Sequence, residues 1–104
     1  MNAWIALVIA GLLEIAWAVG LKQTEGLSKP VPTLFTLVAL GASFYLLAKA
    51  VGELPVGTAY AVWVGIGAAG TALFGMIVLG EPVSAQRLGW IVVLLIAVVG
   101  LKAS

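Results

Sequence analysis

Four long apolar stretches, separated by short polar breaks, dominate this sequence of 104 residues. A helix that crosses a hydrocarbon core roughly 30 Å thick needs about 20 apolar residues, so the chain has room for four crossings. Only 9% of the residues are charged, which is too few to cover a soluble domain of this size with a polar shell. The sequence therefore predicts an all-α membrane protein, with residues 1–104 forming a single transmembrane domain.

Charged residues, glycine and proline mark where the predicted spans end. The first polar break runs from Lys22 to Pro32 and contains three helix-breaking residues. Pro82 is expected in the first turn of the fourth helix, where a missing N–H costs no hydrogen bond. A cleaved signal peptide is not expected, because no basic residue precedes the first apolar stretch and because an acid interrupts it. The predicted spans are 4–21, 33–48, 56–79 and 84–102.

The composition excludes several classes of function. The chain has no cysteine and no histidine, which rules out thiol catalysis, a structural zinc site and a Ser/His/Asp triad. Its net charge is only +1, without a basic run, so nothing indicates a nucleic-acid partner. We expect no enzyme activity, no metal and no cofactor, and the chemistry must come from carboxylates, aromatic rings and hydroxyl groups.

One acidic residue, Glu14, lies near the middle of the first span. An ionised acid at the bilayer centre costs roughly 3 kcal/mol on insertion scales and is a candidate functional group by default. No basic residue lies in the apolar part of any span, so Glu14 must carry a proton or hold a mobile cation. A protonated glutamate that only links two helices is the alternative, but glutamine or serine would do this at lower cost.

Aromatic and small residues accompany Glu14. Gly11 and Trp17, one turn away on either side, share its helix face. The indole of Trp17 offers a π-face to a cation and an N–H to a carboxylate, although interfacial aromatic residues are also common in membrane proteins. Tyr60 and Trp63 share a face of the third span, and that face is expected to line a cavity.

Other positions in the spans have two interpretations each. Ser43, near the centre of the second span, could bond a carboxylate, but a lone serine in a membrane helix often bonds its own helix. Small residues spaced by four in the third span predict close approach of another helix; they are Gly57, Ala61, Gly65 and Ala69. Gly65, Gly67 and Gly70 of the same span are either packing contacts or points where the helix can bend. The fourth span has no polar residue between Leu88 and Leu101, which favours a role in assembly.

Lysine and arginine are divided almost equally between the two membrane sides. Two lie on the side of the termini and three on the other, namely Lys49 and Lys102 against Lys22, Lys29 and Arg87. A difference of one sets orientation weakly, so we expect insertion in both orientations. Many secondary transporters place their site between inverted halves. A second, inverted copy would supply that half in an antiparallel homodimer, with two Glu14 side chains near a shared axis.

Four segments resemble the small multidrug resistance family along nearly the whole chain. They are GLLEIAWAVGL from Gly11, EGLSKPVPTL from Glu25, SFYLLAKA from Ser43 and LPVGTAYAVWVGIGAAGT from Leu54. The resemblance implies a dual-topology, antiparallel homodimer in the cell (inner) membrane that exports small cations in exchange for protons. Trp17, in the run WAVGLK, and the ending VGLK are similar to the guanidinium-exporter branch.

The same resemblance implies roles for five residues. Glu14 would bind the proton and the substrate, and Trp17 and Ser43 would hydrogen-bond and position its carboxylate, while Tyr60 and Trp63 would line the pocket. A broad exporter of quaternary ammonium or polyaromatic cations is an alternative within the same class. A proton-carrying ring subunit or a small membrane assembly protein is a further alternative, which four spans with aromatic residues on two of them disfavour.

Overall fold

The computed structural model describes residues 2–104, and within them the chain forms four α-helices. The helices are α1 (Ala3–Gln23), α2 (Pro30–Val51), α3 (Val56–Ile77) and α4 (Ala85–Ala103). Each is long and apolar enough to cross a membrane. The prediction of an all-helical chain with four candidate spans is therefore confirmed.

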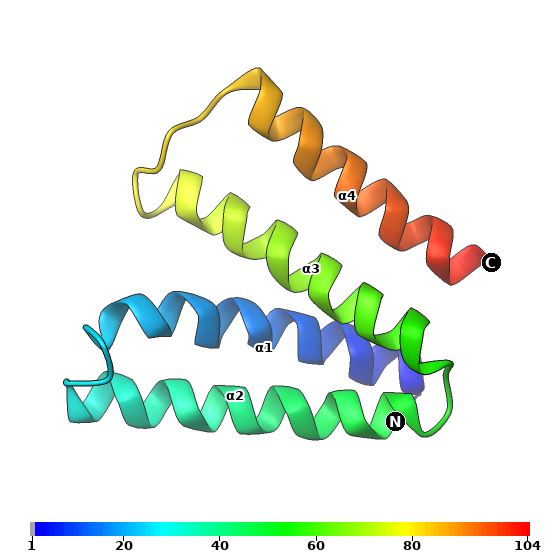
Figure 1. Cartoon of the computed structure of the whole chain (residues 1–104), viewed down its shortest axis with the longest axis horizontal. Helices are drawn as coiled ribbons and strands as arrows, with labels where there is room; N and C mark the ends of the chain where they lie inside the picture. Colours follow the sequence, from blue (N-terminus) through cyan, green and yellow to red (C-terminus); the bar gives the residue numbers. More distant parts are fainter. Residues whose placement is uncertain (1) are drawn as a thin grey trace.

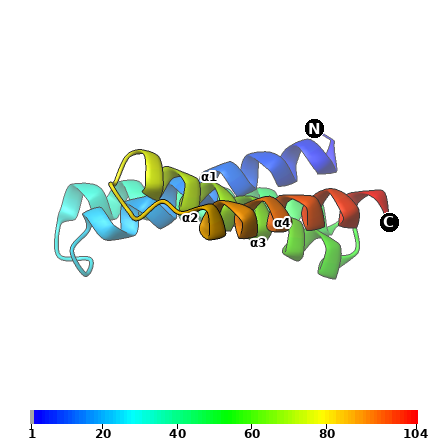
Figure 2. The ribbon, with the colours of Figure 1, turned by 90° about the horizontal axis from the view of Figure 1, so that it is seen from above.

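The helices form a thin layer rather than a closed bundle. α1 and α2 run side by side, α3 crosses over α1, and α4 lies along α3 at the edge (Figure 1). The layer measures 18 Å in its shortest dimension and 40 Å in its longest. The view from above shows that it is thin (Figure 2). Since a helix with its side chains is about 10–12 Å wide, most helices keep one face open to lipid.

The core lies where α1, α2 and α3 meet, and small residues bring these helices close together. It consists of Leu7, Ala10, Ala50, Ala59, Val62 and Trp63. Gly20 of α1 directly contacts the Thr36 side chain of α2, so that any larger residue there would collide with it. Close approach of this kind replaces the hydrophobic driving force that is missing between helices in lipid.

α4 is attached mainly through α3. Gly65 of α3 leaves space for Val98 of α4, which is the close approach that the spacing of small residues predicted, whereas Gly57 has no neighbour within 4 Å. Ile91 is the one buried residue of α4. Leu94 and Val98 are half-buried, and most of the other apolar residues of α4 are exposed.

Two helix starts differ from the sequence-based expectation. Pro30 and Pro32 do not lie in the break, because α2 begins at Pro30 and proline in a first turn gives up no helical hydrogen bond. Pro82 does not lie in α4: it belongs to the connection, and Ser84 is the residue that caps the helix. The Ser84 hydroxyl accepts a hydrogen bond from the backbone N–H of Arg87 at 3.1 Å, which satisfies a donor that the helix start would otherwise leave free.

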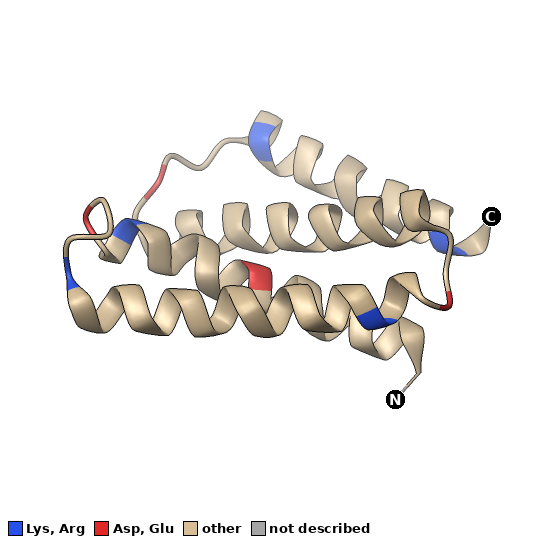
Figure 3. Ribbon diagram, turned by 60° about the horizontal axis from the view of Figure 1, so that its bottom comes forward, with Lys and Arg blue, Asp and Glu red and all other residues tan. Residues whose placement is uncertain are grey.

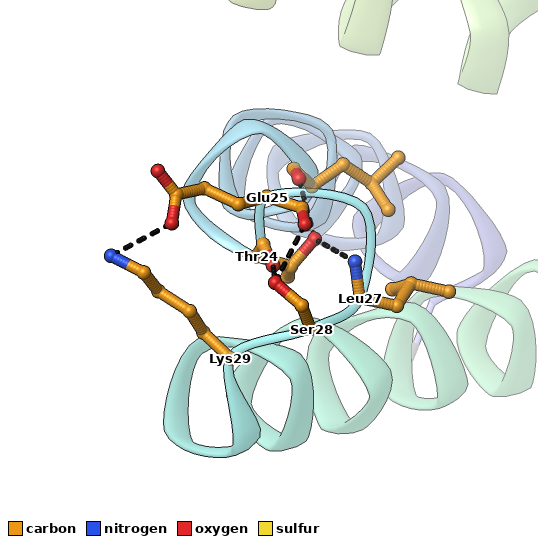
Figure 4. Close-up of polar contacts among 6 residues, drawn as sticks. Thr24, Glu25, Leu27, Ser28 and Lys29 are labelled. Atoms are coloured by element: carbon orange, nitrogen blue, oxygen red, sulfur yellow. Dashed lines mark hydrogen bonds and ion pairs between the residues drawn. The ribbon is translucent and has the colours of Figure 1, made fainter.

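The connection between α1 and α2 is held by its own side chains (Figure 4). The Thr24 hydroxyl donates to the Leu21 carbonyl oxygen at 2.7 Å and accepts from the Leu27 N–H at 3.0 Å. Lys29 and Glu25 form an ion pair at 3.0 Å. Glu25 and Leu27 both have positive φ, 47° and 68°, a strained conformation outside glycine that these contacts maintain.

Candidate functional site

Glu14 lies midway along α1 and faces α3. It is the one acidic residue within the four helices, and the other charged residues lie near helix ends or in connections (Figure 3). A Cβ atom at Gly67 of α3 would overlap the Glu14 carboxyl group. Gly67 therefore leaves the space that the acid occupies between the two helices.

Glycine also lies at the contacts on either side of Glu14. Gly11 of α1 accommodates the side chain of Ile66, and Gly70 of α3 accommodates that of Ile15. At each of these three contacts, a glycine of one helix leaves space for a side chain of the facing helix. Glu14 is the polar member of this series, flanked by two isoleucine contacts.

Glu14 has no fixed counter-ion in the part of the chain that the structure describes. Across residues 2–104, the ion pair present is Lys29 with Glu25, in the connection between α1 and α2. A half-buried carboxyl group without a basic neighbour is neutral when it holds a proton, and otherwise needs a cation from outside the chain. This arrangement suits the binding of a proton or a small cation, one at a time.

Ser43 joins three helices one turn from Glu14. Its buried hydroxyl donates to the Ala10 carbonyl oxygen of α1 at 2.7 Å and accepts from Trp63 Nε1 of α3 at 3.0 Å. Ser43 therefore bonds a neighbouring helix and not its own. The direct bond to Glu14 that the resemblance implied is absent from this structure, where the hydroxyl reaches the turn that precedes the acid.

Trp17 packs against the core formed by α1, α2 and α3. Its Nε1 is buried and has no hydrogen-bond partner within residues 2–104. A buried donor without an acceptor costs about 1–3 kcal/mol. Trp17 therefore carries a donor, one turn from Glu14, that an acceptor in the site would satisfy.

Aromatic rings extend the site from the core residue Trp63 to the exposed Tyr60. Trp63 is 4% exposed and Tyr60 is 57% exposed, and their ring centres are 5.7 Å apart. Phe44 also contacts Trp63, with ring centres 5.4 Å apart. The structure thus brings Ser43, Tyr60 and Trp63 together and adds Phe44, which the sequence-based prediction missed although it is the neighbour of Ser43.

The sequence is similar to known proteins along nearly its whole length. Residues 2–99 match the sequence profile of the family described as Small Multidrug Resistance protein. A protein of Yersinia pestis named guanidinium exporter is 55% identical over 100 residues, which cover 96% of each chain. The guanidinium exporters of Escherichia coli K12 and Salmonella typhimurium LT2 are 52% and 50% identical over 102 residues, which cover 98% of this chain and 97% of theirs.

Proposed function

Since this chain belongs to the small multidrug resistance family, a group of membrane transporters and not of enzymes, we propose that it exports guanidinium and small guanidinyl cations in exchange for protons. The observation that carries this proposal is the position of Glu14. It is an acid at mid-membrane, with space provided by Gly67 and with no fixed counter-ion among residues 2–104. The names of relatives that are at least half identical over nearly the whole chain support guanidinium as the cation.

The chemistry of guanidinium fits this site. The ion is planar and keeps its charge at physiological pH, and its N–H groups match the two oxygens of a carboxylate in a bidentate pair. Trp63 and Tyr60 can offer ring faces to the delocalised cation. In our proposal, Glu14 binds the substrate or the proton, Trp17 donates its free N–H to the Glu14 carboxylate, and Tyr60 and Trp63 line the pocket.

Ser43 acts indirectly in this mechanism. Its hydroxyl bonds the Ala10 carbonyl and the Trp63 ring. Ala10 is one turn before Glu14 on α1, and Trp63 is one turn before Gly67 on α3. Ser43 therefore positions the site, and it reaches the carboxylate itself only if α1 and α2 shift relative to each other.

Exchange requires that proton and cation compete for the same group. Moving a bare carboxylate through a closed, dry state is costly, so the protein changes its access from one side to the other when Glu14 holds a proton or a cation. We propose that two chains in opposite orientation form the transporter, because one chain leaves most of the apolar surface of α4 exposed. Exchange of the two protomers' conformations then opens the site to either side.

Transport by the purified protein in liposomes with an imposed pH gradient tests this function. Wild-type protein is expected to move guanidinium against the proton flux, and Glu14→Gln is expected to abolish this coupling, because glutamine binds neither ion. Glu25→Gln, which removes an exposed acid of the connection between α1 and α2, is the matched control and should transport normally. Guanidinium export by Glu14→Gln at the wild-type rate would refute the proposal.

A further inference from the structure

A cavity of about 530 Å³ opens between the beginning of α1 and the end of α2. Ala3 and Ala6 form its α1 side, and Tyr45 and Lys49 of α2, with Glu53 of the following turn, form the other side. Ala6 precedes Glu14 by eight residues, which is roughly 12 Å along the helix. The cavity is therefore separate from the Glu14 site, and its size is within the range of about 300–1,000 Å³ for small-molecule sites.

Opposite charges lie at the rim of this cavity without neutralising each other. Lys49 and Glu53 are four residues apart, but α2 ends at Val51, so the helical register that would bring the two side chains together is lost. Within residues 2–104 the ion pair found is the one between Lys29 and Glu25, at the opposite end of α2. The Lys49 ammonium instead lies 5.5 Å from the centre of the Tyr45 ring, and both charges remain available to a ligand.

The position of the cavity across the membrane indicates the kind of ligand that it binds. It lies at the end of two membrane-crossing helices, which is the level of the lipid headgroups. Trp4, in the first turn of α1, and Tyr45 are residue types that prefer this level. Phospholipid headgroups are thus the small polar groups present at this site at high local concentration, and basic pockets between transmembrane helices are known to hold the headgroups of anionic lipids.

We propose that this cavity binds the headgroup of phosphatidylethanolamine, with the phosphate on Lys49 and the primary ammonium on Glu53. A primary ammonium donates hydrogen bonds to a carboxylate, whereas the trimethylammonium of phosphatidylcholine has no N–H to donate. Phosphatidylglycerol could place its phosphate on Lys49, but it has no ammonium and would leave the Glu53 carboxylate without a cation. The pair of uncompensated charges therefore selects a zwitterionic lipid whose positive end is a hydrogen-bond donor.

Native mass spectrometry of the full-length protein tests this, with ethanolamine and choline phospholipids of identical acyl chains supplied at equal concentration. The wild type is expected to retain the ethanolamine lipid over the choline lipid by about fivefold or more, the ratio that about 1 kcal/mol of charge interaction gives. Glu53→Gln should bring this ratio close to one, because the partner of the ammonium is lost. Lys49→Gln should reduce the binding of both lipids, since both carry the phosphate.

Glu25→Gln and Lys29→Gln are the matched controls, because they remove one charge of each sign at the opposite membrane side and should leave the ratio unchanged. Equal retention of the two lipids by the wild type would overturn the proposal. The same holds if Glu53→Gln keeps the wild-type preference. The measurement requires no transport, so its result is independent of whether the chain exports guanidinium.

Discussion

Gly67→Ala is expected to weaken guanidinium binding while leaving the fold intact. The added Cβ would overlap the Glu14 carboxyl group, which is the end of a flexible side chain and can move away. Crowding of a packed site costs about 1–3 kcal/mol, and here the movement falls on the group that binds the cation. At about 1.4 kcal/mol for each tenfold change, guanidinium affinity should fall by roughly 5- to 150-fold.

Isothermal titration of the purified protein with guanidinium measures this change, and thermal unfolding measures stability. Alanine favours a helix over glycine by about 1 kcal/mol, so the midpoint of unfolding should not fall greatly. Gly70→Ala is the first control, because it crowds the same interface against Ile15 rather than Glu14. Gly57→Ala, which meets no atom within 4 Å, is the second control and should bind normally.

The outcome decides between two reasons for glycine at position 67. If Gly67→Ala binds guanidinium as the wild type does, the space beside Glu14 is not needed for cation binding. If Gly70→Ala loses as much affinity as Gly67→Ala, close packing of α1 on α3 is the cause, and the position of the carboxylate is not. Either result would refute the reasoning.

Three further predictions concern the site and the topology. Ser43→Ala should lower the free energy of unfolding by about 1–3 kcal/mol, because the Trp63 N–H and the Ala10 carbonyl lose a buried partner; a thermal midpoint equal to that of wild type would contradict this. Trp17→Gly should admit bulkier hydrophobic cations, measured by their competition against guanidinium in transport, and an unchanged substrate ranking would count against its role in selectivity. Labelling of a single cysteine placed after Ser104 should find the C-terminus on both membrane sides, because the lysine and arginine bias is one residue, and complete labelling from one side would exclude dual orientation.

The number of helices follows from the sequence because the physical requirement is simple. Four apolar stretches of membrane length have few alternatives to four helices. The helix ends were less predictable, since proline is compatible both with a connection and with a first helical turn. Pro30 lies in the first turn of α2, whereas Pro82 lies in the connection before α4. The capping residue Ser84 was the sequence signal for the start of α4.

The candidate site was predictable in its chemistry but not in its contacts. Glu14 is conspicuous as an acid among apolar residues, and the face shared by Tyr60 and Trp63 follows from helical spacing. The pairing of Glu14 with Gly67 depends on how α3 crosses α1, which no local pattern determines. For the same reason, the bond from Ser43 to Ala10 could not be derived, because the partner is a backbone carbonyl of another helix.

The hydroxyl of Ser43 also restricts how the protein can move. It belongs to α2 and forms hydrogen bonds with both α1 and α3. Inside a membrane protein no water is available to replace either bond. If one of these helices slid past the others, the Trp63 N–H or the Ala10 carbonyl would lose its hydrogen-bond partner. We expect the three helices to swing as one rigid body during transport, with the deformation concentrated at the junction to α4, where the contact is apolar and can slip without breaking a hydrogen bond.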